Sequence, residues 1–162
     1  MAAGATYEPI ATTTISGTST NSYTFSSIPS TYTDLVLVVS GSTVSTNGVL
    51  SQVNGDTGTN YSATFLYGDG SSAASIRNSN EVSLSTGYFD TSNSNMIIHY
   101  MNYKNTTTYK TVLSRSNASG SFLGARASLW RNTAAITSIK IFGSGTNLGD
   151  ATTLTLYGIA AA

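Results

Sequence analysis

The sequence predicts an all-β fold, a single-domain antiparallel β-sandwich that is jelly-roll-like. Apolar runs of strand length recur at a spacing of roughly 8–14 residues, which is typical of sandwiches. Short breaks rich in Ser, Thr, Asn and Gly separate these runs, and no long segment has helical periodicity. We expect eight to ten strands from this pattern.

The centre of the pattern is a stretch with three consecutive runs, at residues 96–103, 109–116 and 121–130. Two short polar breaks divide them, so they predict a β-meander. The first run carries apolar residues on both alternating faces, which predicts a central strand with both faces covered. The third alternates Gly124, Arg126 and Ser128 with Ala125 and Ala127, so one face points inward and the other outward or towards a partner.

The other elements follow from the same reasoning in chain order. Residues 1–9 are small or turn-forming and predict an N-terminal arm, before a sandwich domain at 10–162. The run at 33–40 is β-branched and apolar on both faces, so it predicts a second central strand. The remaining strands are predicted at 10–15, 21–28, 48–53, 60–67, 81–85, 136–142 and 151–159, with a hairpin loop at 54–59 and longer loops at 71–80 and 86–94.

Composition limits the class of protein. Of the 162 residues, 26 are Ser and 26 are Thr, and only 9% are charged, against about 25% in an average domain. Ten Tyr and five Phe, together with the aliphatic runs, distinguish the chain from a disordered segment. There is no Cys, so a disulfide or thiolate metal site is excluded, and neither a signal peptide nor a membrane span is recognisable.

Charge is balanced overall but unevenly distributed along the chain. The formal net charge is zero, which argues against a nucleic-acid partner. Residues 1–90 carry six acidic side chains and one basic one, whereas residues 91–162 carry six basic and one acidic. This uneven distribution can arise by chance. The alternative explanation is that the acidic half of one copy contacts the basic half of another copy or of a neighbouring protein. With little charge to keep copies apart, we expect a homo-oligomer.

The residues that could carry chemistry do not form a catalytic pattern. The single histidine, His99, lies inside an apolar run, where a histidine usually belongs to a core or an interface. No nucleophile elbow or carboxylate pair stands out, so we predict that the chain is not an enzyme and needs no cofactor. Asp56 and Asp69 lie in Gly-bearing turns that offer oxygen ligands to calcium, but the spacing fits no EF-hand and no metal is expected.

Aromatic and basic side chains give two alternative binding hypotheses. Tyr and Trp on the face of a β-sandwich can stack against sugar rings, or they can fill a core and anchor a protein interface. The candidate contact residues for an interface or a ligand are Tyr7, Tyr103, Tyr109, Arg126, Trp130 and Arg131.

Four segments resemble structural proteins of tailed bacteriophage particles, especially those of marine and cyanobacterial phages. They are residues 7–13 (YEPIATT), 25–38 (FSSIPSTYTDLVLV), 105–115 (NTTTYKTVLSR) and 154–159 (LTLYGI). The family has no catalytic signature to transfer, so the resemblance implies a role in the particle and no active-site residues.

The resemblance implies a virion location, reached by assembly in the host cytoplasm. A capsid decoration or cement protein, which bridges neighbouring capsid subunits, is the favoured expectation, as a small cyclic oligomer with a trimer favoured. A tail or tail-fibre component and a host-glycan-binding module remain as alternatives. The expected partners are other virion proteins, with carbohydrate possible and neither nucleic acid nor membrane expected.

Overall fold

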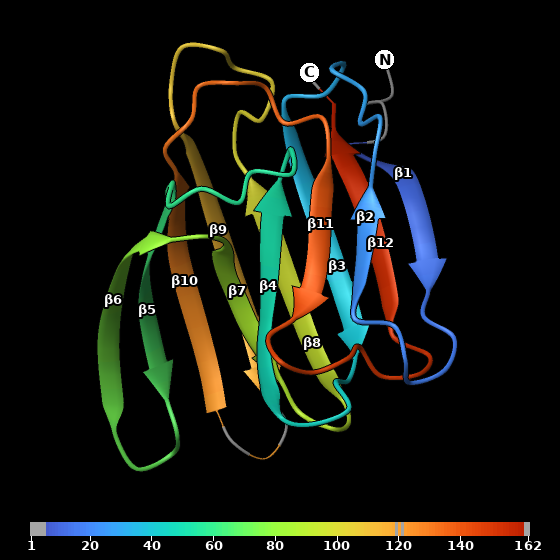
Figure 1. Ribbon diagram of the computed structural model, residues 1–162, viewed down its shortest axis with the longest axis vertical. Helices are drawn as coiled ribbons and strands as arrows, with labels where there is room; N and C mark the ends of the chain where they lie inside the picture. The colour runs from blue at the N-terminus through green and yellow to red at the C-terminus, as the bar shows by residue number, and fades with distance from the viewer. Residues whose placement is uncertain (1–5, 119, 121, 161–162) are drawn as a thin grey trace.

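The computed structural model describes residues 6–118, 120 and 122–160 as two antiparallel β-sheets, with no helix among them (Figure 1). The predicted all-β sandwich is confirmed. Sheet A contains eight strands in the order β1 (Tyr7–Thr14), β12 (Thr153–Ile159), β3 (Asp34–Gly41), β8 (Ser94–Tyr100), β9 (Lys110–Ala118), β10 (Phe122–Trp130), β5 (Tyr61–Gly68) and β6 (Ala73–Glu81). Sheet B contains β2 (Ser22–Phe25), β11 (Ile139–Gly143), β4 (Asn47–Val53) and β7 (Leu84–Phe89).

The strand order is that of a jelly roll with two hairpins added. Strands β1, β12, β3 and β8 form one four-stranded half, and β2, β11, β4 and β7 form the other. Successive strands of this set alternate between the two sheets except at β4 and β7, which pair with each other in sheet B, as in two nested Greek keys. The hairpins β5–β6 and β9–β10 extend sheet A beyond β8, so that sheet A is twice as wide as sheet B (Figure 1).

The core lies between the two sheets and contains the strongest predicted strands. Leu35, Leu37 and Val39 of β3 are fully buried, and Leu37 pairs across the sheet with the buried Ile98 of β8. Burying a side chain of this size contributes about 1.5–3 kcal/mol, so these two strands supply much of the stability. Both occupy interior positions of sheet A, as the sequence predicts for 33–40 and 96–103.

The predicted meander is confirmed, because β8, β9 and β10 are consecutive and adjacent in sheet A. Along β9, buried and exposed residues alternate almost without exception. On β10, Arg126 and Ser128 point inward and are buried, while Ala125 and Ala127 point outward and are exposed. One side of this hairpin therefore packs on sheet B, and the other forms part of the open face of sheet A.

Three sequence predictions about the middle of the chain are wrong. The predicted loop at 71–80 contains most of β6, an edge strand whose side chains are nearly all exposed and so show no apolar alternation. The predicted loop at 86–94 contains most of β7. The strands at 48–53 and 60–67 exist as β4 and β5, but they lie in different sheets, so the turn between them is a crossover and not a hairpin loop.

At the N-terminus, β1 begins at Tyr7, within the range predicted as an arm. Tyr7 pairs with Ile159 and Pro9 pairs with Tyr157, so these residues belong to sheet A. The first five residues of the predicted arm lie outside the described part of the chain. Among the described residues, no helix has the length and apolar character that a membrane crossing requires.

Candidate functional site: the outer face of sheet A

The side of sheet A that points away from sheet B is unusually apolar, and we call it the outer face. On β3 it carries Val36 and Val38, and on β8 it carries Ile97, between the fully or almost fully buried core residues of the same strands. The sequence predicts both faces of these strands to be covered. Sheet B covers only one of them. On the other face Val36 is only 7% exposed, whereas Val38 and Ile97 are half-buried, so the described chain leaves part of an apolar surface open where the pattern indicates a buried one.

The pairing register aligns this surface into two rows that run across five strands. Neighbouring residues in each row are direct cross-strand partners, so their side chains lie close together on the same face. One row contains Val36, His99, Leu113, Ala127 and Thr64; the next contains Val38, Ile97, Arg115, Ala125 and Leu66.

These two rows line an open groove of about 700 Å³, which Tyr7 also lines. On β10 the groove passes over the small side chains of Ala125 and Ala127, which stand between larger ones on β9 and β5. A second hollow of about 680 Å³ shares Leu66, Arg115 and Ala125 with the first and continues towards β6. We call the combined depression the β10 groove.

Large apolar side chains border the β10 groove and are exposed to solvent. Leu66 is 62% exposed, Leu123 is 68% exposed and Leu113 is 42% exposed. Single exposed leucines are common in soluble proteins, but a contiguous set on one face marks a binding surface. Arg115 adds a positive charge beside the groove, and it forms no ion pair with any residue in the described part of the chain.

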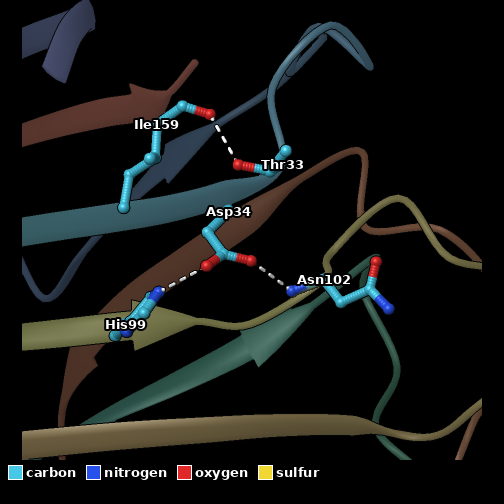
Figure 2. Close-up of polar contacts among 5 residues, drawn as sticks. All are labelled: Thr33, Asp34, His99, Asn102 and Ile159. Atoms are coloured by element: carbon cyan, nitrogen blue, oxygen red, sulfur yellow. Dashed lines mark hydrogen bonds and ion pairs between the residues drawn. The ribbon is translucent and has the colours of Figure 1, made fainter. Parts of the chain in front are cut away.

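His99 lines the groove and is held in place by Asp34 (Figure 2). Its Nε2 atom lies 3.0 Å from Asp34 Oδ2, while Asp34 Oδ1 accepts a 2.6 Å hydrogen bond from the backbone N–H of Asn102. Thr33, the preceding residue, donates from its hydroxyl to the carbonyl of Ile159 at 2.9 Å. Asp34 therefore joins the start of β3 to the end of β8 and fixes the imidazole at the edge of the groove.

Of the six contact residues predicted from the sequence, Tyr7 lines the groove. It is 55% exposed, and its ring packs edge-on against Tyr157 with centroids 6.3 Å apart. Tyr109 is also 55% exposed, but it precedes β9 and does not line the groove. Arg131 is partly buried, and its Nη2 donates to the carbonyl of Thr59 at 2.7 Å.

The other three predicted contact residues are interior. Trp130 and Tyr103 are each 1% exposed; the indole nitrogen donates to Asp56, and the Tyr103 hydroxyl donates to the carbonyl of Pro29. Arg126 is 4% exposed and its guanidinium lies over the rings of Phe65 and Tyr88, at 4.9 and 5.7 Å from their centroids. Arg126 also borders the groove, but its guanidinium points inward to these rings. All three side chains are buried and offer almost no surface to a partner, so we leave them out of the site.

Desolvation lowers the pKa of two interior groups. Burial lowers the pKa of the Arg126 guanidinium, which is inside the sandwich between β10, β5 and β7. Burial likewise lowers the pKa of Lys110, whose ammonium donates to the carbonyls of Thr108 and Thr133 at 2.8 and 3.1 Å. Both cations are therefore parts of the interior and lie apart from the exposed charge of Arg115.

Asp56 and Asp69 lie in the two turns that the sequence analysis considered for calcium. In the structure their carboxylates accept hydrogen bonds from the protein, most of them within the same loops. Asp56 accepts hydrogen bonds from the side chains of Trp130 and Asn60 and from the N–H of Gly58. Asp69 accepts from the backbone N–H groups of Ser71 and Ser72, and these bonds lower its pKa to about 2. Within the described ranges, no three His, Cys, Asp or Glu side chains gather into a metal-binding group.

Comparison with known proteins leaves the fold and the groove as the basis for any functional conclusion. The chain matches no protein-family model, and its comparison with curated proteins finds no relative. By fold and site, the protein belongs to the class of jelly-roll β-sandwiches with an open apolar groove on one sheet. Sequence reasoning did not find this groove, although the two-faced apolar runs at 33–40 and 96–103 were a signal of it.

Proposed function

We propose that this chain is a structural protein of a bacteriophage particle, specifically a decoration or cement protein that binds a neighbouring capsid subunit through the outer face of sheet A. The observation that carries the proposal is the β10 groove with its border of exposed leucines. Contiguous apolar surface of this kind in a soluble chain favours a protein partner, whose apolar side chains would fill the groove.

The position of the resemblance supports the same assignment. Residues 25–38, 105–115 and 154–159 contain most outer-face residues of β3, β9 and β12, among them Val36, Val38 and Leu113. The segments that resemble phage structural proteins therefore contribute directly to the candidate binding surface.

The physical role is cohesion between subunits. A neighbouring subunit docked over the groove would remove the exposed leucines from water, at about 25 cal/mol for each Å² of apolar surface buried. A stable contact buries on the order of 800 Å² on each partner, so the interface has to cover the five strands of the two rows and extend onto the neighbouring outer face. The free charge of Arg115 would then select a partner with an acidic group at the matching position.

The first test is the copy number of the chain in purified virions, measured by quantitative mass spectrometry against the major capsid protein. We expect about one copy for each capsid subunit, or one for a few subunits, as a lattice protein requires. A few dozen copies or fewer for each particle would instead assign the chain to the tail or a fibre. Absence from the particle would overturn the proposal.

The second test places a charge in the groove. Leu113→Lys should weaken binding to capsids that lack the protein by tenfold or more, because the new ammonium would be buried against apolar surface. Val44→Lys is the matched control, since Val44 is a similarly exposed apolar residue, 49% accessible, and does not line the groove. Equal binding by the two variants, with unchanged melting temperatures, would exclude the outer face as the contact surface.

A host glycan is the second candidate ligand, favoured by the exposed ring of Tyr7 at the groove. His99, held by Asp34, supplies a polar side chain elsewhere in the same groove. This candidate predicts saturable saccharide binding that Tyr7→Ala abolishes, measured by titration calorimetry with host surface polysaccharide. Substituting Trp130 or Tyr103 would not test it, because both side chains are buried.

A further inference from the structure

The outermost strand of sheet A, β6, has a free edge that is suited to main-chain pairing. It pairs with β5 on one side only, from Ala73 opposite Gly68 to Glu81 opposite Tyr61. All its residues except Asn78 and Glu81 are exposed, and Figure 1 shows β5 and β6 at the end of sheet A beyond sheet B. Among the described strands, none pairs with the backbone groups along its outer side, which makes β6 a template for another strand.

The other sheet edges carry features that block such pairing. β1, at the opposite end of sheet A, contains Pro9, which lacks an N–H, and its register shifts between Pro9 and Ala11. In sheet B, β2 has only four residues, and β7 packs against β9 and β10 and has a register shift opposite Val49 and Leu50. Short strands, bulges and prolines are the usual protection of edges, and β6 carries its bulge only at its C-terminal end, so among the described edge strands it offers the longest uninterrupted edge.

The regular part of β6 is symmetric about one residue. Its register with β5 is unbroken from Ala73 to Ser79, and the only irregularity follows at Asn80, which has a left-handed backbone with φ of 59°. Ile76 is the midpoint of this seven-residue segment. It is 45% exposed and shares the face of Phe65, its partner on β5.

We propose that β6 pairs antiparallel with β6 of a second copy of this chain, about a two-fold axis through Ile76, to form a homodimer with one continuous sheet. In this register Ile76 lies opposite Ile76 of the second copy, and Arg77, the one charge of the regular segment, lies opposite Ser75. No like charges are directly opposed, and a β-branched pair occupies the axis. The zero net charge of the chain also removes the general repulsion between copies.

The same geometry limits the assembly to two copies. Each copy uses its β6 in the pairing, so the free edges of the joined sheet are the two β1 strands with their Pro9 residues. An isologous contact of this kind closes on itself and does not grow into a fibre. A two-fold axis perpendicular to the sheet also places both β10 grooves on the same side, so that the dimer would present two binding surfaces to one lattice.

The register can be tested by disulfide cross-linking, because the chain has no cysteine of its own. In Ile76→Cys the two sulfur-bearing residues would be direct cross-strand partners, with Cβ atoms about 4.5–5.5 Å apart, close to disulfide geometry. Ala74→Cys is the matched control on the same face of the same strand. In the dimer the two introduced cysteines would be offset by four residues, about 13 Å along the strand, and could not form a disulfide.

We expect purified Ile76→Cys to form a covalent dimer at least tenfold faster than Ala74→Cys under mild oxidation, with both variants melting at the temperature of the unmodified protein. Light scattering should give the unmodified chain the mass of a dimer, and Ile76→Lys, which opposes two ammonium groups on the axis, should give a monomer. Thr14→Lys, on the β1 edge, should remain a dimer.

Any one of three results would overturn the proposal: the unmodified chain is a monomer, the two cysteine variants cross-link equally fast, or Ile76→Lys remains a dimer. A three-fold mass would instead favour the trimer expected from the sequence and would also overturn it. All these measurements use the purified chain without particles. Their failure is therefore distinguishable from failure of the proposed capsid binding, which is measured on virions.

Discussion

The indole Nε1–H of Trp130 donates a 2.7 Å hydrogen bond to Asp56 Oδ2, and this bond joins the end of β10 to the loop that crosses from sheet B to sheet A. The hydroxyl of Tyr61, the first residue of β5, donates to the backbone carbonyl of Asp56 at 2.9 Å. Asp56 thus fixes the start of the hairpin β5–β6 against β10, and with it one wall of the β10 groove.

The bond between Trp130 and Asp56 should contribute measurably to stability. Trp130→Phe keeps an aromatic ring but removes the donor, and we expect a loss of about 2–4 kcal/mol of unfolding free energy, from the lost charge-assisted bond and the smaller ring. Asp56→Ala removes the acceptor and should cost a similar amount. In urea unfolding, the double variant should cost less than the sum of the two, by about 1–3 kcal/mol. Strict additivity would contradict the assignment.

The same carboxylate should make stability depend on acid. Burial opposes ionisation of Asp56, but hydrogen bonds from Trp130, Asn60 and Gly58 outweigh it and hold its pKa below the ordinary value of 3.8. Because the folded pKa is below the unfolded one, this stabilisation is complete above about pH 4 and is lost as the pH falls through the folded value. Melting temperatures from pH 6 to pH 2 should fall less steeply for Asp56→Asn than for the unmodified chain.

Other carboxylates will retain part of that acid dependence. Hydrogen bonds from the backbone of Ser72 and Ser71 lower the pKa of Asp69 to about 2, and a hydrogen bond from the Thr46 hydroxyl is the main cause of the lowered pKa of Asp90. The comparison between Asp56→Asn and the unmodified chain is therefore the informative one. An identical pH slope in both would show that Asp56 is not stabilised as its contacts indicate.

Arg126 should be replaceable by an uncharged side chain of similar length. Its guanidinium lies between the rings of Phe65 and Tyr88, and its burial disfavours the charge. Arg126→Met would keep most of the volume, whereas Arg126→Ala would leave a cavity. We expect the Met variant to be more stable than the Ala variant by about 1–3 kcal/mol in urea unfolding. Equal stability would mean that the charge, and not the packing, is what this position requires.

Gly158 should not tolerate a side chain. A Cβ atom there would lie 2.2 Å from Cγ of Tyr32, whose ring covers this part of β12. Gly158→Ala should therefore destabilise by about 1–3 kcal/mol, the usual cost of overpacking. Gly48→Ala is the control, because its added Cβ would make only ordinary contacts, the nearest at 3.5 Å to Ser144. Thermal melts of the two variants test the difference, and a similar loss in both would contradict the close packing of Tyr32.

Several features of the fold could be predicted from local pattern because strands alternate their side chains between two faces. The runs that became β3, β8, β9 and β10 have strong alternation or two-faced apolar character, and their length and spacing indicated a jelly roll. The inward set on β10, with Arg126 and Trp130, was also visible as one half of an alternating strand. β6 was missed because both its faces are exposed, which removes the hydrophobic pattern that marks a strand.

The sequence by itself determined the all-β class, the central strands and which residues share a face of each strand, because those follow from side-chain period and β-propensity. Tertiary structure decided which faces are covered and which side chains meet. Only the pairing register places Ala125 between Arg115 and Leu66, and Ala127 between Leu113 and Thr64, to open a groove. Val38 and Ile97 lie outside the core because they point away from sheet B, and the described chain has no further sheet on that side. These relationships join residues far apart along the chain, where local pattern carries no information about distance.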